Sequence, residues 1–199
     1  MHYNSEVFNH QIPILKKFVY HLIYQRELNY LHKEFNIQSE FWVHTMDAHL
    51  RDACIHWCMV FGSDKSNPTH WKNLFDSETK KEEDSFRQAL FKEVGFDKQT
   101  WNEYWNNMKN FRDKYVAHRE VDFKAPVPYL NKALEVAFVF DDWVRGFISY
   151  IDLEDNIYTY FEELPLRKSA EKLREYVKPF FRMLMERTIE YHKSCLRPV

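Results

Sequence analysis

Glycine is so scarce in this chain that folds built from many tight turns are disfavoured. Gly62, Gly95 and Gly146 are the only three glycines among 199 residues. β-Hairpins and barrels need repeated turns with positive φ, which glycine adopts most readily. The hydrophobic share of 45% is ordinary for a globular protein, so enough apolar side chains are present for a core. These observations predict an all-α protein, a helical bundle of about six to eight helices.

Apolar periodicity and turn residues divide the chain into predicted helices. Pro13 suits the first turn of the first helix, and Ser39 is a good N-cap for the second. Thr100 and Glu103 form a capping-box pattern, and Pro179 is expected to kink or split the last helix. The expected helices cover about 14–35, 39–62, 68–75, 80–94, 100–118, 129–151 and 166–191.

Charge is distributed unevenly along a chain whose formal net charge is only −2. We expect a single domain over residues 1–199, in which 165–199 is a basic C-terminal helical extension with nine Lys and Arg against four Glu. Four of these cations share a helical face, interrupted by Glu171: Arg167, Arg174, Lys178 and Arg182. This stripe is either an ordinary solvated surface or a track for RNA phosphates.

Cysteine usage and hydropathy indicate the compartment. Cys54 and Cys58 lie one helical turn apart, where an unstrained disulfide is disfavoured, and Cys195 leaves an odd number. The chain has no N-terminal secretory pattern and no apolar run that approaches a membrane span. We therefore expect a reduced, cytoplasmic protein without a membrane partner.

An apolar seam with two polar residues at its end is the strongest functional signal. Steps of three and four residues give this face: Trp101, Tyr104, Met108, Phe111, Tyr115 and finally His118. Arg112 lies at one edge and His118 at the other, about 120° apart on the α-helical scale. In the plain interpretation, His118 ends a core helix and Arg112 pairs with a carboxylate. In the sharper one, Arg112 holds the oxygens of a phosphodiester and His118 transfers the proton of a hydroxyl.

The residues from Arg112 to His118, read RDKYVAH, resemble the signature of the HEPN superfamily of small α-helical proteins. That signature is an Arg followed, after four to six residues, by a His, and a polar residue such as Asp113 usually follows the Arg. The wider string from Phe111 to Glu120, with a proline-containing loop and a long helix after it, is similar to the abortive-infection branch.

The resemblance implies a metal-independent endoribonuclease of toxin or antiphage-defence type, without a metal or other cofactor. Arg112 and His118 would be catalytic, and the motif would lie at a homodimer interface. RNA would be the substrate, and an antitoxin or defence-system protein a further partner. Asp113 would hold Arg112 or the motif backbone, while Lys114 and Arg119 would add phosphate contacts. One branch carries a tyrosine two residues after the histidine as a modification target, and this chain has a glutamate there.

A polar face of the second predicted helix offers supporting residues. Glu40, His44, Asp47 and Arg51 recur at helical spacing. Weak ion pairs on an exposed face are the plain interpretation. Alternatively, this face lines a cleft opposite the motif, where Asp47 orients the His118 ring and Arg51 contacts the substrate.

Two further functions remain open. The same fold is compatible with a non-catalytic HEPN-like module that binds RNA, a nucleotide or a protein partner. A metal-dependent hydrolase is weaker, since the ten histidines give neither HExxH nor CxxC spacing. The three separated glycines exclude a glycine-rich phosphate loop. Trp101, Tyr104 and Trp105 are able to stack bases, although core packing explains them more simply.

Overall fold

The computed structural model describes residues 3–75, 80–118, 120, 122, 124–148 and 164–195. Over these residues the regular structure is helical, apart from one isolated β-bridge between Tyr3 and Phe75. The predicted all-α bundle is therefore confirmed. Its elements are α1 (Ser5–Phe35), α2 (Glu40–Phe61), the 3-10 turn η1 (Trp71–Leu74), α3 (Lys80–Val94), α4 (Lys98–Phe111), the π-helical turn η2 (Arg112–Ala117), α5 (Leu130–Ile148) and α7 (Leu166–Cys195).

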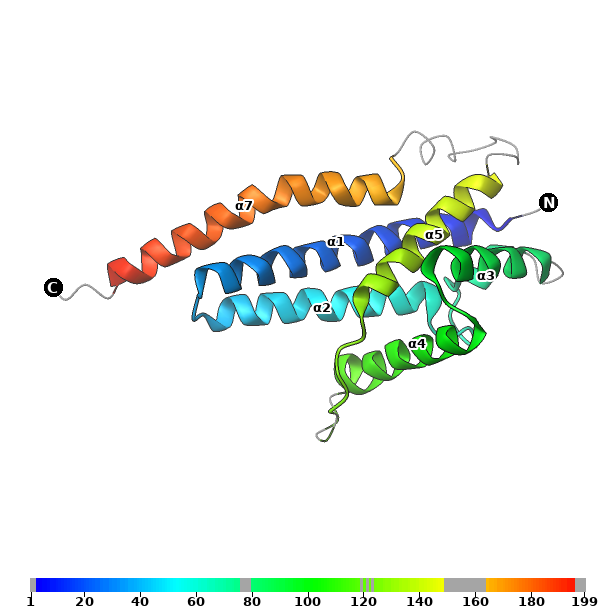
Figure 1. Cartoon of the computed structure of the whole chain (residues 1–199), viewed down its shortest axis with the longest axis horizontal. Coiled ribbons are helices and arrows are strands. Elements are labelled where there is room, and N and C mark those ends of the chain that lie inside the picture. Colours follow the sequence, from blue (N-terminus) through cyan, green and yellow to red (C-terminus); the bar gives the residue numbers. More distant parts are fainter. Residues whose placement is uncertain are drawn as a thin grey trace.

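Three long helices form the body of the bundle. Figure 1 shows α1 between α2 and α7, with α2 returning alongside α1 as a helical hairpin. The shorter helices α3, α4 and α5 gather at the end of the hairpin where the N-terminus lies, and α5 crosses α1 obliquely (Figure 1). α3 packs on α5, while η2 packs on α2. The motif predicted to be functional therefore lies on the flank of the hairpin.

Aromatic side chains fill the core where the short helices meet the hairpin. Phe61 of α2 contacts Phe140 of α5 edge to face, with ring centroids 5.5 Å apart, and Phe86 of α3 contacts the same ring at 5.4 Å. All three are essentially inaccessible to solvent. Burying one such ring contributes about 1.5–3 kcal/mol, so this layer fixes α3 and α5 on the hairpin.

Two predicted helix starts were wrong because better caps lie earlier in the chain. α1 begins at Ser5, where the Asn4 side chain accepts a hydrogen bond from the Val7 amide at 3.1 Å. Pro13 consequently lies inside α1, on its exposed side, where water is able to replace the missing N–H donor. α4 begins at Lys98 rather than after a cap at Thr100.

The capping box of α4 also differs from the predicted one. The Asp97 carboxylate accepts from the Thr100 amide and the Thr100 hydroxyl accepts from the Asp97 amide, both at 2.8 Å. Glu103 instead accepts from Gln99, at 2.9 Å. An aspartate caps a helix as well as a threonine does, and α4 uses Asp97 as its N-cap, one turn before the predicted Thr100.

Pro179 was expected to kink or split the last helix, and α7 continues through it as one helix, so a split is wrong. Figure 1 shows the axis of α7 bending along its length. The proline is exposed, so its lost backbone hydrogen bond faces water. None of the described helices is long and apolar enough to cross a membrane. Cys54 and Cys58 are free, buried thiols, and burial raises the pKa of Cys58 to about 12.

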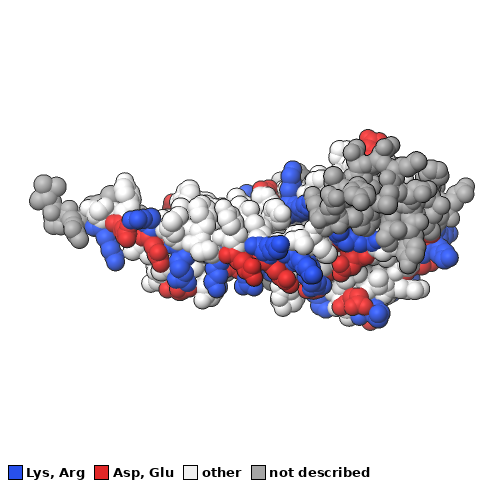
Figure 2. Space-filling model, turned by 90° about the horizontal axis from the view of Figure 1, so that it is seen from above, with Lys and Arg blue, Asp and Glu red and all other residues white. Residues whose placement is uncertain are grey.

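The cations of α7 hold this helix on its neighbours. Figure 2, seen from the side on which α7 lies in Figure 1, shows basic and acidic side chains alternating along this face. Glu27 is 3% exposed, and a buried carboxylate needs a compensating charge. Lys178 lies over the Tyr30 ring at 5.9 Å. The arginines of the stripe form these ion pairs: Arg167 with Glu135, Arg174 with Glu27, and Arg182 with Glu34.

Candidate functional site

The motif helix ends where the sequence predicts, but its last part is not an α-helix. From Arg112 to Ala117 the backbone forms the π-helical turn η2, and His118 caps its C-terminal end. The His118 amide donates to the Asp113 carbonyl at 3.0 Å, five residues back. The separation of about 120° predicted between Arg112 and His118 assumed α-helical geometry, so it does not apply across this turn.

The apolar seam anchors the motif to the core. Met108 and Phe111 are buried, at 0% and 2% exposure. The Tyr115 ring stacks on Phe111 with centroids 4.9 Å apart and planes inclined by 19°. The seam therefore holds one side of the turn against the hairpin, and the polar residues lie around its edges.

Arg112 is held by its sequence neighbour. Its Nε and Nη2 both lie 2.6 Å from Oδ1 of Asp113, and the two side chains are 28% and 48% exposed. Arg112 is therefore accessible at the surface, although an incoming phosphate must compete with a carboxylate. The positive charge of Arg112 also opposes the burial that raises the pKa of the Cys58 thiol, as expected for a guanidinium facing α2.

His118 is exposed, in contrast to the packing face on which the sequence placed it. Its backbone is extended, with φ −129° and ψ 105°, so the chain leaves the helix at this residue. Within the described part of the chain, its ring forms no hydrogen bond or ion pair. An imidazole in this position is free to meet a substrate or a second protein molecule.

Asp47 and Arg51 lie beside the motif, as predicted, but they contact Tyr115. The Tyr115 hydroxyl donates to Asp47 Oδ1 at 3.0 Å, and Asp47 Oδ2 lies 3.1 Å from Nε of Arg51. The second contact is an ion pair without hydrogen-bond geometry, because Arg51 Nε lacks a hydrogen-bond partner. The Arg51 guanidinium also lies 5.9 Å from the Tyr115 ring centroid. Asp47 Oδ1 thus joins η2 to α2 while Oδ2 faces Arg51 within α2, and the expected contact of Asp47 with His118 is not among those described.

Of the two further predicted phosphate ligands, Lys114 is described and Arg119 lies outside the described residues. Lys114 Nζ is 3.3 Å from Oε2 of Glu120, and both side chains are about half exposed, at 46% and 52%. Lys114 also lines a hollow of about 480 Å³ beside Asn107 and Asn110. An exposed ion pair of this kind is weak, so Lys114 is available to an anion.

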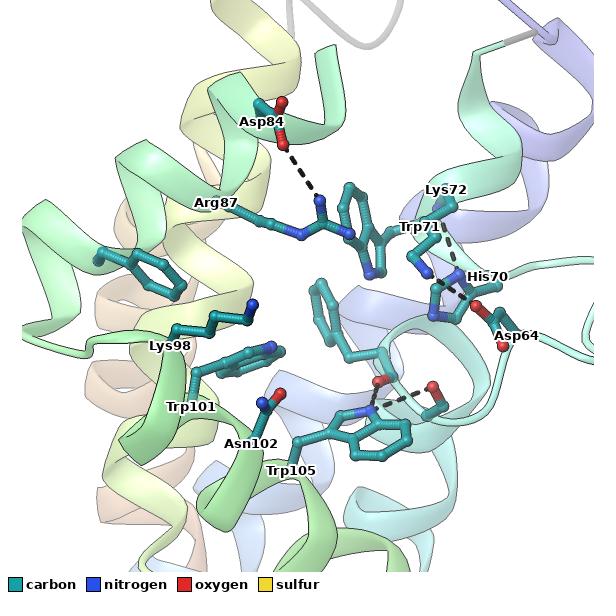
Figure 3. A pocket seen from close by; sticks show the side chains of 13 residues that line it. Asp64, His70, Trp71, Lys72, Asp84, Arg87, Lys98, Trp101, Asn102 and Trp105 are labelled. Carbon is teal, nitrogen blue, oxygen red and sulfur yellow. Dashed lines mark hydrogen bonds and ion pairs between the residues drawn. The ribbon is translucent and has the colours of Figure 1, made fainter. Parts of the chain in front are cut away.

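A larger cavity lies between α3 and α4, and the sequence gave only a partial indication of it. We call it the α3–α4 cavity; its volume is about 560 Å³. Figure 3 shows Arg87 of α3 above it and Lys98, Trp101 and Trp105 of α4 on the other side. The two indoles are half-buried rather than fully packed. Core packing, the simpler sequence interpretation, therefore accounts for only part of their surface.

Histidines from α1 and α2 also come together, without forming a recognisable metal site. Nδ1 of His21 lies 2.9 Å from Nδ1 of His49, and the His21 ring stacks on His56 at 5.7 Å. Burial is the main cause that lowers the pKa values of His21 and His49. In the part of the chain that the structure describes, no group of three or more His, Cys, Asp or Glu is arranged to hold a metal ion.

Comparison with known proteins adds no relative to this description: no protein-family model, no curated protein and no solved structure matches the chain.

Proposed function

We propose that the chain is a HEPN-like, metal-independent endoribonuclease of toxin or antiphage-defence type that acts as a homodimer in the cytoplasm. The observation that carries the proposal is the π-helical turn over Arg112–Ala117. π-Turns interrupt α-helices frequently at functional sites, and this one coincides with the Arg-to-His motif. It begins at a partly exposed guanidinium and ends at an exposed imidazole.

The proposed reaction uses the ribose itself as nucleophile. The 2′-oxygen attacks the adjacent phosphorus while a base takes its proton, and the bond from phosphorus to the 5′-oxygen breaks as that oxygen gains a proton. Arg112 leaves Asp113 and neutralises the charge that develops on the phosphate oxygens. His118 of one protomer and His118 of the second copy serve as base and acid. The products are a 2′,3′-cyclic phosphate and a 5′-hydroxyl.

The dimer follows from the chemistry of a single exposed histidine. Base and acid must act on opposite sides of the phosphorus, and one imidazole per chain supplies only one of them. A two-fold axis beside η2 brings a second copy of both residues to the same linkage. Nearby, Lys114 pairs with Glu120 at the surface and is able to rotate toward a phosphate.

Cleavage of a mixed RNA pool tests the proposal, with and without a chelator. We expect chelator-resistant cleavage that falls about 100-fold or more in His118→Asn and in Arg112→Gln, because each variant removes one essential group. His10→Asn replaces an exposed histidine on α1 and is the matched control. Mass spectrometry identifies the cyclic phosphate ends. Binding without cleavage would establish the non-catalytic alternative, and activity abolished by chelator would establish a metal-dependent one.

Mixing the parent with the His118→Asn variant tests the shared site. If both copies of His118 act on one linkage, random exchange in an equal mixture leaves about one quarter of parent activity, since only the dimers with two parent chains carry both imidazoles, whereas independent sites would leave about one half. Sedimentation analysis measures dimer formation in the same samples. A monomeric protein, or an equal mixture that keeps about half of the parent activity, would contradict the composite site.

A further inference from the structure

We propose that the α3–α4 cavity binds a nucleoside 5′-monophosphate, with its base against Trp101 and its phosphate at Lys98. The inference does not rest on ribonuclease activity. The cavity holds about 560 Å³, within the range of roughly 300–1,000 Å³ typical of small-molecule sites. A base, a ribose and one phosphate fit this volume, whereas a single phosphate would leave most of it empty.

Charge balance at the cavity wall favours an anion. Lys72 is paired with Asp64 at 2.7 Å, and Arg87 is paired with two carboxylates, Glu83 at 2.9 Å and Asp84 at 3.2 Å. No acidic side chain among the described residues pairs with Lys98. Figure 3 shows Lys98 extending over Trp101, with its amine toward the hollow and Arg87 on the opposite side. Lys98 is therefore the lining cation whose amine has no ion-pair partner among the described residues, and it lies beside an aromatic surface.

His70, the histidine at the cavity wall, is neutral and leaves the charge of the wall unchanged. His70 lines the cavity and is 2% exposed, and burial lowers its pKa to about 4. At neutral pH its ring adds no charge. The anion-binding character of the cavity therefore resides in Lys98, since Arg87 is paired with Glu83 and Asp84.

The indoles are fixed before a ligand arrives. Trp105 Nε1 donates to the Phe61 carbonyl at 2.7 Å, and Lys109 covers the Trp105 ring at 4.0 Å. Trp101 is held edge to face by Phe96, with centroids 5.5 Å apart. A fixed half-buried indole gives a planar ligand a stacking surface at little entropic cost. Stacking on such rings is a general mode of nucleobase binding.

An amide at the same wall suits the edge of a base. Asn102 lies beside Trp101 on the cavity side in Figure 3, and it is exposed. Its side chain offers both donors and an acceptor, which a nucleobase edge can complement. Together, a stacking surface, an uncompensated cation and an amide match a 5′-phosphorylated nucleoside better than a purely apolar or purely anionic ligand.

The same chemistry occurs in a free mononucleotide and at the 5′ end of an RNA strand. Calorimetry with the full chain therefore uses AMP, GMP, CMP and UMP, with adenosine and inorganic phosphate as partial ligands. A 2′-O-methylated trinucleotide, with or without a 5′-phosphate, identifies the source. We expect at least one mononucleotide to bind about tenfold or more tightly than the nucleoside or phosphate alone.

Two lysine variants provide a matched comparison. Lys98→Gln should weaken mononucleotide binding about fivefold or more, while Lys92→Gln, which alters an 82% exposed lysine on α3, should leave it unchanged. Trp101→Phe should weaken base-dependent binding while keeping an aromatic ring against Phe96. Thermal midpoints of all variants establish that they fold.

No binding of any mononucleotide up to about 5 mM would overturn the proposal. Equal affinities of the Lys98→Gln and Lys92→Gln variants would also overturn it, because binding would then lie elsewhere. Binding of mononucleotides without cleavage of RNA would leave this site supported and the ribonuclease proposal refuted, so the two outcomes are distinguishable.

Discussion

Acid should destabilise this protein through a single buried histidine, His70. It caps η1, where its Nδ1 accepts from the Lys72 amide at 3.3 Å. Burial is the main cause that lowers its pKa to about 4, and Lys72 adds to the effect. Asp64 and a hydrogen bond with the Gly62 backbone act in the opposite direction. The folded protein therefore strongly favours the neutral ring.

The sign of the pH dependence follows from the two protonation states. The unfolded chain has the ordinary value of 6.5 and binds the proton first as the pH falls. Stability is therefore complete above pH 6.5 and declines between 6.5 and about 4. A pKa difference of about 2.5 corresponds to roughly 3 kcal/mol in total, of which about 2 kcal/mol is already lost at about pH 5.

Urea unfolding of the parent and of His70→Asn, at about pH 7.5 and pH 5, measures this contribution. Asparagine keeps an acceptor for the Lys72 amide but does not titrate, so His70→Asn should lose about 2 kcal/mol less than the parent on acidification. The half-buried His21 and His49, whose pKa values are also lowered, contribute equally to both proteins and cancel. His10→Asn is the exposed control and should behave as the parent. If the free energy of unfolding falls equally on acidification in the parent and in His70→Asn, the reasoning is refuted.

Three stability predictions follow from other contacts, each measurable by urea unfolding. Gly62→Ala should destabilise by more than about 2 kcal/mol, since an added Cβ would clash with the Cys58 carbonyl oxygen. Gly146→Ala should stabilise by about 0.5–1 kcal/mol, because the backbone is helical and no atom of the described residues lies within 4 Å of an added Cβ. Tyr115→Phe should cost about 0.5–1.5 kcal/mol by removing its hydrogen bond to the aspartate on α2; no loss would mean that the bond has no net effect. Arg174→Ala should cost more than Arg182→Ala, because Arg174 compensates the buried Glu27.

Much of the fold could be predicted because its signals are local. Scarce glycine and apolar periodicity indicated the helices, and α3 covers the predicted 80–94. Its end is marked by Gly95, whose φ of 72° suits glycine. The start of α1 was missed because a proline on an exposed helical face costs less than its position in the sequence suggests.

The candidate site was less predictable because it depends on side chains from separate helices. Periodicity placed the Arg-to-His segment at a helix end, and it put Asp47 on the facing helix. It could not show that the Asp47 carboxylate reaches Tyr115, nor that the backbone there shifts to π-helical hydrogen bonding. For Trp101, periodicity predicts that the side chain points toward the core, but it does not predict whether other side chains fill the space beside the indole. That depends on how α3 and α4 diverge.

Two hydrogen bonds join the α4–η2 segment to α2, one from the middle of α4 and one from η2. Trp105 donates to the carbonyl at the end of α2, and Tyr115 reaches an aspartate about four turns earlier on that helix. Because two hydrogen bonds fix the α4–η2 segment to α2, the segment cannot rotate about either bond alone. We therefore expect the α4 wall of the cavity and η2 to move together. Backbone amide protons between Trp105 and Tyr115 should consequently exchange with solvent as slowly as those of α2. A partner that displaces α2 would displace the cavity wall and η2 at the same time.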